Sequence, residues 1–180
     1  NNQTCKIVFV GRLIGKKGIA FLVDALSYMP NDLSWELDIY GDGVDRESIE
    51  KKIENSVVAN HINLLGNRPL NQISEAYKTA DIFVLPSLRE TSGNVLLEAM
   101  AYAVPIVAFD TSFSSMLKEH DCGIFIDTNQ NIEEIKQGFC CALTRLIKDA
   151  GLREQLGLNG KDFANANLTW EQKFKHIYAR

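Results

Sequence analysis

The sequence contains few of the residues that hold metal ions or cross-link a chain. Its 180 residues include four cysteines and three histidines. The cysteines are too few and too unevenly spaced for a disulfide framework, and Cys140 and Cys141 are adjacent, so they do not bridge each other. No cysteines or histidines have the spacing of a zinc site. We therefore expect a reduced, cytoplasmic protein with no protein-bound metal or other cofactor.

Long apolar segments and basic stripes are also absent. The most apolar stretch, residues 95–109, is interrupted by Glu98 and Pro105, so no run approaches the ~20 apolar residues of a membrane span. Nineteen lysines and arginines are scattered along a chain of net charge −4. This excludes nucleic acid and an anionic membrane as main partners, and leaves membrane association to a longer parent protein.

The composition predicts one globular domain spanning residues 1–180, because 46% of the residues are hydrophobic and 23% are charged. The first ten residues, NNQTCKIVFV, resemble neither a signal peptide nor a transit peptide. They lead into a strand within a few residues, as expected of a domain taken from a longer chain.

Six short apolar runs alternate with longer segments of helical periodicity. Several runs are apolar on both faces, which is typical of parallel strands covered by helices on both sides. The pattern predicts an α/β fold with a doubly wound, six-stranded parallel sheet, which is Rossmann-like, followed by C-terminal helices. The predicted strands are 5–10, 35–40, 61–65, 82–85, 106–109 and 123–127, and the predicted helices between them are 17–29, 46–58, 72–79, 93–103 and 112–119.

The residues after the last predicted strand are helical in pattern. Apolar side chains from Ile132 to Ile147 form one stripe at helical spacing. Asn131 with Glu134 predicts a capping box at the start of this helix, and a second box at 169–172 precedes a final helix over 170–179. The glycines at 157 and 160 predict a helix break.

The loop after the first predicted strand contains glycines and cations. The segment 11–18, GRLIGKKG, places Arg12 and Lys17 ahead of the next helix. Ligands of doubly wound sheets bind outside the carboxyl ends of the strands, where glycine admits close approach and a helix N-terminus attracts anions. A diphosphate site and a solvated loop explain this segment equally well. A Walker loop is excluded by the glycine spacing, and no GxGxxG fingerprint occurs.

The loop after the fourth predicted strand gives a stronger signal. In residues 86–101, PSLRETSGNVLLEAMA, Glu90 lies in the loop, and the N–H groups from Gly93 to Val95 open the next helix toward an anion or a sugar oxygen. Glu98 lies about one and a half turns into that helix. Its neighbours are apolar, so its carboxylate needs a partner. A ribose 2′,3′-diol is one candidate partner, and a nearby lysine or arginine is the other.

The order of these motifs resembles glycosyltransferase family 4, also called group 1. The matching pieces are G-R-L-x-x-x-K-G, two glutamates separated by seven residues, and E-A-M-A-x-x-x-P-I-V-A, within a match from about Ile7 to Ile177. Members of this family are retaining enzymes of the two-domain GT-B architecture. The resemblance implies that this chain is the C-terminal, donor-binding half and that an N-terminal acceptor domain belongs to the parent protein.

The resemblance also implies residue roles. The implied catalytic residues are Arg12 and Lys17, which hold the donor diphosphate and stabilise the leaving group, and Glu90, which contacts the donor sugar. Glu98 holds the ribose. The other implied donor-binding residues are Gly11, Gly93, Asn94, Val95 and Leu96 through their backbones, and Asn67, Arg68 and Leu70 beside the nucleobase. The implied donor is a nucleotide-diphosphate sugar of the UDP or GDP type, and no protein-held metal is needed.

The sequence departs from the family pattern in three places. Thr91 follows the first glutamate where glycine is usual, Ala103 precedes Val104-Pro105 where glycine is usual, and residues 111–116 replace a glycine pair and a glutamate. These departures concern the identity of the donor sugar and leave the fold unchanged.

Two alternatives to sugar transfer with retention stay open. One is a non-catalytic nucleotide-binding or interaction module of the same fold, which the altered segment 111–116 favours if it abolishes donor binding. The other is a nucleotide-sugar epimerase, against which the ordered motifs argue. The sequence alone predicts the transferase.

Overall fold

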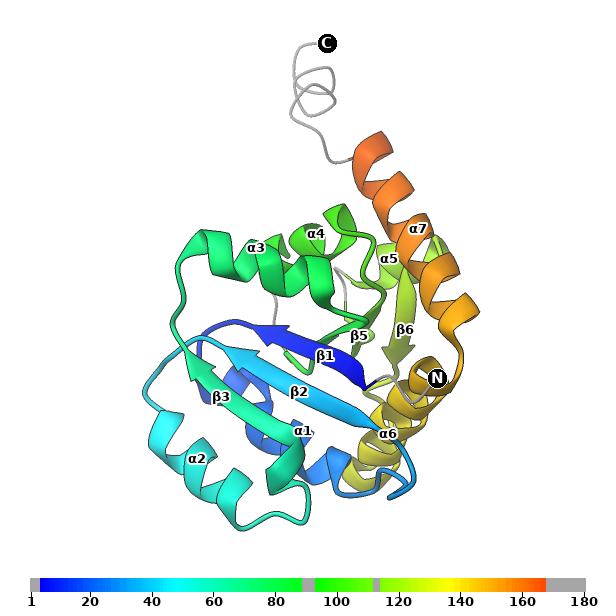
Figure 1. Ribbon diagram of the computed structural model, residues 1–180. Helices are drawn as coiled ribbons and strands as arrows, with labels where there is room; N and C mark the ends of the chain where they lie inside the picture. Colours follow the sequence, from blue (N-terminus) through cyan, green and yellow to red (C-terminus); the bar gives the residue numbers. More distant parts are fainter. Residues whose placement is uncertain (1–3, 89–92, 112–113, 168–180) are drawn as a thin grey trace.

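The computed structural model describes residues 4–88, 93–111 and 114–167. Six parallel strands form one sheet in the order β3–β2–β1–β4–β5–β6 (Figure 1). The chain starts in the middle of the sheet and winds outward twice, which is the doubly wound, Rossmann-like topology that the alternating pattern predicts. The strands are β1 (Cys5–Val10), β2 (Trp35–Tyr40), β3 (Ile62–Gly66), β4 (Ile82–Leu85), β5 (Ile106–Phe109) and β6 (Gly123–Ile126).

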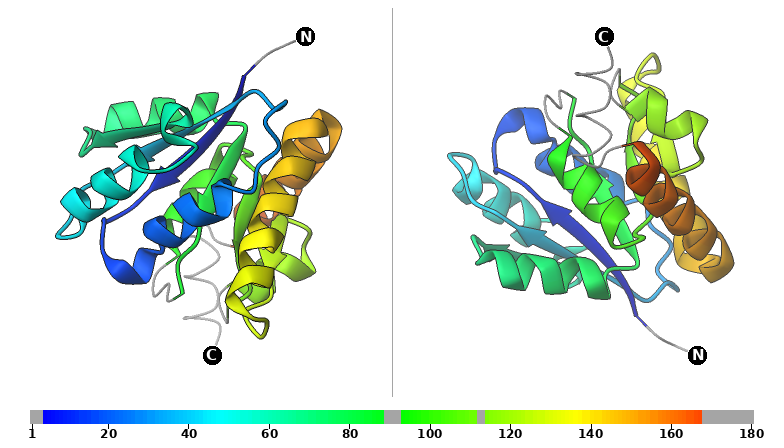
Figure 2. Two further views of the ribbon diagram at one scale, coloured as in Figure 1. Left: turned by 90° about the horizontal axis from the view of Figure 1, so that it is seen from below. Right: turned by 90° about the horizontal axis from the view of Figure 1, so that it is seen from above.

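Helices cover both faces of this sheet (Figures 1 and 2). One face carries α1 (Ile19–Leu26), α2 (Arg46–Glu54) and α6 (Ile132–Lys148), and the other carries α3 (Leu70–Thr79) and α4 (Asn94–Ala101). The remaining elements are α5 (Ser114–Glu119), α7 (Ala150–Asn167), which packs on α4, and two short 3-10 turns, η1 (Gly15–Lys17) and η2 (Ala59–His61).

The burial of each strand explains the pattern of apolar and polar residues in its sequence. Every residue of β4 and β5 is buried, because these strands are covered on both faces. In β2 the residues alternate between buried and half-buried, so Tyr40 at its end keeps partial access to solvent. Phe21 of α1, Phe109 of β5 and Phe139 of α6 pack with ring centroids 5.0–5.7 Å apart and join the two helices over β5.

The predicted capping box of α6 is present. The amide oxygen of Asn131 accepts from the N–H of Glu134 at 3.0 Å, and a Glu134 carboxylate oxygen accepts from the N–H of Asn131 at 3.1 Å. Local sequence is enough to define this helix start, because both groups lie within one turn. The second predicted box at 169–172 and the predicted helix over 170–179 lie outside the described residues.

The predicted helix break at the glycines near 157–160 is wrong. Helix α7 continues through both of them. They serve close packing instead: a Cβ at Gly157 would lie 1.9 Å from the carbonyl oxygen of Ala103, and a Cβ at Gly160 would lie 3.1 Å from the side chain of Met100. Contacts with α4 and with the turn that follows it therefore outweigh the weak helix propensity of glycine.

Ala103 itself has a left-handed backbone with φ of 57°, at the position where the family pattern has glycine. Such a conformation costs a non-glycine residue about 1–2 kcal/mol, and glycine adds about 0.4–1 kcal/mol of unfolded-state entropy. We therefore expect Ala103→Gly to raise the free energy of unfolding by about 0.5–1 kcal/mol, measured by urea titration. Ala101→Gly, in the helical last turn of α4, is the matched control and should lower stability by a similar amount.

Candidate functional site

The loops that follow β1 and β2 are hydrogen-bonded to each other, and the β2 loop is hydrogen-bonded to the end of β3. The N–H of Leu13 donates to the carbonyl of Asp42 at 2.9 Å, and the N–H of Gly41 donates to the carbonyl of Gly66 at 2.9 Å. The carboxyl ends of three neighbouring strands thus form one continuous surface, where doubly wound sheets bind their ligands.

The loop after β1 also contacts the segment that precedes α4. The carbonyl of Lys16 accepts from the N–H of Leu88 at 3.2 Å and from the hydroxyl of Ser87 at 3.3 Å. Gly18 lies directly against Pro86, and a Cβ there would be 2.0 Å from the Pro86 carbonyl oxygen. The two segments that carry the predicted phosphate and sugar contacts are therefore held together by their backbones.

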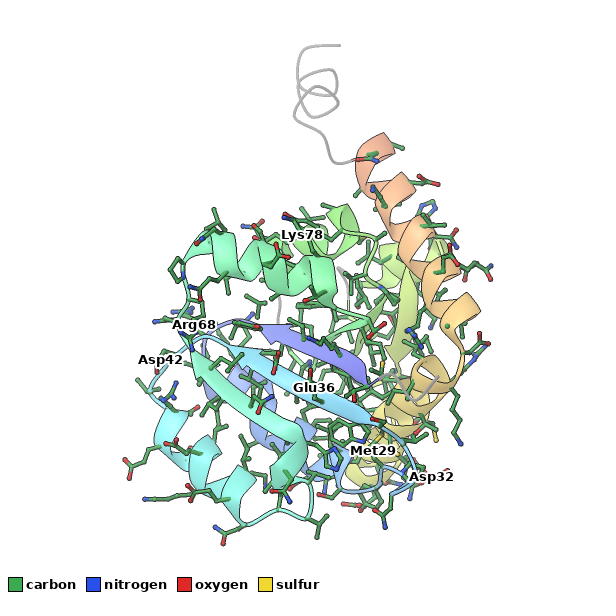
Figure 3. All side chains as sticks on the ribbon, viewed as in Figure 1. Met29, Asp32, Glu36, Asp42, Arg68 and Lys78 are labelled. Carbon is green, nitrogen blue, oxygen red and sulfur yellow. The ribbon has the colours of Figure 1, made fainter. Side chains whose placement is uncertain are left out.

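An open cavity of about 240 Å³ lies at the ends of β1, β2 and β3. Gly11, Arg12, Asn67 and Arg68, which come from two loops about fifty-five residues apart in sequence, all line it. Its other lining residues are Val10, Tyr40, Gly41, Asp42 and Ile73. In Figure 3, Arg68 and Asp42 lie at this same edge of the molecule, whereas Met29 and Asp32 lie near the opposite ends of the strands.

The cavity combines positive charge with an apolar wall. Arg12 and Arg68 are exposed, and Ile73 contributes an apolar side chain from α3. Burial chiefly raises the pKa of Tyr40 and the nearby Asp38 adds to this rise, while the positive charge of Arg68 lowers that pKa. Two cations beside an apolar surface suit a ligand with both an anionic part and a flat or apolar part.

Helix α4 begins beside these loops at the carboxyl end of β4. Its N-cap, Gly93, has a left-handed backbone with φ of 62°. The carbonyl of Gly93 accepts from the N–H groups of Leu96 at 2.9 Å and Leu97 at 3.0 Å, so the helical ladder starts there. The N–H groups of Asn94 and Val95 precede this ladder, as the first amides of a helix do.

Glu98 takes a tyrosine as its partner. Its side chain is on the exposed face of α4, and its Oε2 accepts from the hydroxyl of Tyr77 at 3.1 Å. No lysine or arginine in the described ranges forms an ion pair with it. The charge of Glu98 is therefore held by a neutral donor and is not cancelled by a cation of the described residues.

Comparison with known proteins connects this geometry to a family. The family model described as "Glycosyl transferases group 1" matches residues 1–163. The chain belongs to this family.

A curated relative and two solved structures are similar to this chain. An uncharacterized glycosyltransferase from Methanocaldococcus jannaschii is 31% identical over 169 residues, which are 92% of this chain and 44% of the relative. The structure of the Anabaena protein HepE in complex with UDP and glucose superposes with a TM-score of 0.82 at 20% identity, over 98% of this chain and 49% of HepE. The C-terminal domain of a group 1 family protein from Francisella tularensis superposes with a TM-score of 0.79 at 23% identity, over 92% of this chain and 87% of that domain.

The chain spans less than half the length of the curated relatives that it matches. In structure it spans about half of HepE, but most of the isolated Francisella domain. The likeness to these two structures concerns the fold, which confirms the predicted GT-B-type, Rossmann-like architecture.

The structure places the predicted site residues in different parts of the fold. Gly11, Arg12, Asn67 and Arg68 meet in one cavity. Lys17 ends the η1 turn, and Gly93 to Glu98 form the start of α4. Leu70 does not join the cavity: it opens α3 with 77% of the residue exposed, because the helix turns Ile73 toward the cavity in its place. Glu90 lies outside the described residues.

Sequence reasoning missed Tyr40, Ile73 and Tyr77. Tyr40 ends β2 at the carboxyl edge of the sheet, so its position after an alternating strand was the available signal. Ile73 and Tyr77 are four residues apart on α3 and therefore share one helix face. Their spacing indicates a buried face, but only the packing of α3 against α4 brings Tyr77 to Glu98.

Two searches of the described residues give negative results. Within ranges 4–88, 93–111 and 114–167, no group of three or more histidine, cysteine, aspartate and glutamate side chains is arranged to hold a metal ion. In the same part of the chain, no helix has the length and apolarity required to cross a membrane.

Proposed function

We propose that residues 1–180 form the donor-binding domain of a retaining glycosyltransferase. The full protein would transfer a sugar from a nucleotide-diphosphate sugar, of the UDP or GDP type, to an acceptor hydroxyl. One observation carries this proposal. Arg12 and Arg68 line the same cavity as the apolar side chain of Ile73, and helix α4 carries Glu98, whose carboxylate is bound by the neutral hydroxyl of Tyr77.

Each part of a nucleotide-sugar has a matching group at this edge of the sheet. Arg12 and Lys17 supply positive charge for the diphosphate, and as the sugar departs they stabilise the charge that develops on the leaving nucleoside diphosphate. Glu98 accepts hydrogen bonds from the ribose hydroxyls, and the cavity beside Asn67 and Arg68 takes the nucleobase. Glu90 orients the donor sugar, in keeping with the family resemblance.

The acceptor site belongs to an N-terminal domain of the parent protein in this proposal. Two findings support it. The match to the Methanocaldococcus relative covers 92% of this chain but only 44% of the relative, and the isolated Francisella C-terminal domain has the same fold. In the GT-B arrangement the acceptor would lie in the cleft between the two domains. The chain alone should then bind donor without turning it over.

The first test is calorimetric titration of the chain with UDP, GDP, ADP and UDP-sugars. We expect one nucleoside diphosphate to bind, which identifies the base. A charge-assisted hydrogen bond contributes about 1.5–3 kcal/mol, so Glu98→Ala should weaken this binding about 10- to 100-fold. Glu50→Ala is the matched control, because Glu50 is an equally exposed helical glutamate on α2 and should bind as the wild type does.

The full-length protein decides between transfer and its two rivals. Incubation with the nucleotide-sugar that binds and with candidate acceptors should release nucleoside diphosphate and yield a glycoside of unchanged anomeric configuration, read by NMR. An epimerised donor would establish the epimerase. Binding without either product would establish the non-catalytic module, and an inverted product would refute retention.

A further inference from the structure

Tyr77 is a buried tyrosine whose hydroxyl reaches the proposed ribose site. It lies on α3, and only 2% of the residue is exposed. Its hydroxyl is 3.1 Å from Glu98 Oε2 and 3.4 Å from the carbonyl oxygen of Val95, both on α4. Because one hydroxyl has one proton, the shorter contact with the charged oxygen is the principal hydrogen bond.

The ring of Tyr77 is fixed from two sides. It stacks on Tyr102 with centroids 5.8 Å apart and planes inclined by 8°, and it packs at 48° against Phe83 with centroids 5.7 Å apart. Phe83 is fully buried in β4. Burial, and after it the negative charge of Glu98, raise the pKa of the Tyr77 phenol. The hydroxyl therefore stays protonated at neutral pH and donates from a fixed position.

Glu98, unlike the buried Tyr77, lies on an exposed helix face, where a glutamate side chain samples many rotamers. The bond from Tyr77 selects rotamers that keep Oε2 beside α3. Within the described residues no group donates to the other oxygen, Oε1. The carboxylate is thus held at one oxygen and open at the other, and a neutral donor leaves its charge intact.

The position of α3 connects this pair to the cavity. Ile73, one turn before Tyr77, lines the cavity in which Arg12 and Arg68 meet. The same helix face therefore contributes an apolar wall to the cavity and the hydroxyl that holds Glu98. A ligand that spans the two would place its nucleobase beside Ile73 and its ribose beside Glu98.

We propose that Tyr77 is a positioning residue that orients Glu98 to receive the ribose hydroxyls of a nucleoside diphosphate. This inference rests on the proposed donor-binding function and adds a residue that acts through Glu98 without touching the ligand. It requires that the contribution of Tyr77 vanish when either the ribose hydroxyls or the Glu98 carboxylate is removed.

The test is titration of the chain with UDP, GDP and ADP and with their 2′,3′-dideoxy counterparts. For the base that the wild type binds, Tyr77→Phe should weaken binding of the ribonucleotide about 3- to 10-fold and leave the 2′,3′-dideoxynucleotide almost unaffected. In a Glu98→Gln background, Tyr77→Phe should cause no further loss. Tyr102→Phe is the matched control, because it removes the hydroxyl of the stacked partner and should bind both nucleotides as the wild type does.

The ratio of the two affinities separates positioning from folding. Because both nucleotides are measured on the same variant, a partly unfolded population lowers both affinities equally and leaves the ratio unchanged. Equal weakening of both nucleotides, or no weakening of either, would overturn the role of Tyr77 while donor binding stands. A wild-type chain that binds none of the six nucleotides would overturn the proposed function, and this inference with it.

Discussion

Replacing Gly18 by alanine should destabilise the chain by about 3 kcal/mol or more and abolish nucleotide binding under assay conditions. Gly18 has φ of 72°, a left-handed conformation that costs alanine about 1–2 kcal/mol. The added Cβ would also lie 2.0 Å from the Pro86 carbonyl oxygen, which is backbone and cannot rotate away. Relief of that overlap separates the loops after β1 and β4, at a cost of about 0.5–1.5 kcal/mol for each lost hydrogen bond. Guanidinium unfolding measures the first effect and calorimetry the second.

Gly15→Ala in the same loop is the control for this prediction. A Cβ at Gly15 would meet only an oxygen of Asp45 at 3.7 Å, which is an ordinary contact. This variant should therefore unfold within about 0.5 kcal/mol of the wild type. Similar losses in the two variants would show that the contact between Gly18 and Pro86 does not hold the loops together.

The double variant Arg12→Ala, Lys17→Ala should weaken binding of the preferred nucleoside diphosphate at least about 100-fold. Each charge-assisted contact to phosphate contributes about 1.5–3 kcal/mol, which is a 10- to 100-fold change in affinity. The corresponding nucleoside, which has no phosphate, should bind the variant as weakly as it binds the wild type. Calorimetry with both ligands separates loss of the phosphate contacts from general damage to the cavity.

The chain offers a control with the same change in net charge. Lys51 and Lys52 on α2 form ion pairs with Glu47 at 2.8 Å and Asp24 at 2.6 Å, away from the cavity lining. The double variant Lys51→Ala, Lys52→Ala should leave nucleotide affinity within about 3-fold of the wild type, because salt screens exposed charges that lie away from the cavity. If both double variants lost affinity equally, the effect would be long-range electrostatics and the assignment of Arg12 and Lys17 would fail.

The loops that carry the proposed site are held in place by contacts within this chain. Backbone hydrogen bonds fix the β2 loop against the β1 loop and against the end of β3, and Pro86, in the segment before α4, packs against Gly18 of the β1 loop. None of these contacts requires a second domain. We therefore expect donor binding to belong to this chain and turnover to need the parent protein.

The sequence by itself determined the order of the elements, the parallel sheet and the family. These follow from local patterns: strands apolar on both faces, a capping box within one turn at Asn131, and motifs of fixed spacing after each strand. The topology then placed the loops carrying Arg12 and Arg68 at one edge, since parallel strands share their carboxyl ends. The roles of these residues remain proposals that the binding experiments test.

Only the tertiary structure decided which side chains face one another. It replaced Leu70 by Ile73 in the cavity, continued α7 through Gly157, and gave Glu98 a hydrogen bond from the hydroxyl of Tyr77, a partner that the sequence did not predict. Each outcome depends on the packing of one helix against another from a distant part of the chain. Local propensities carry no information about such contacts, because they arise only when the whole sheet brings α3, α4 and α7 together.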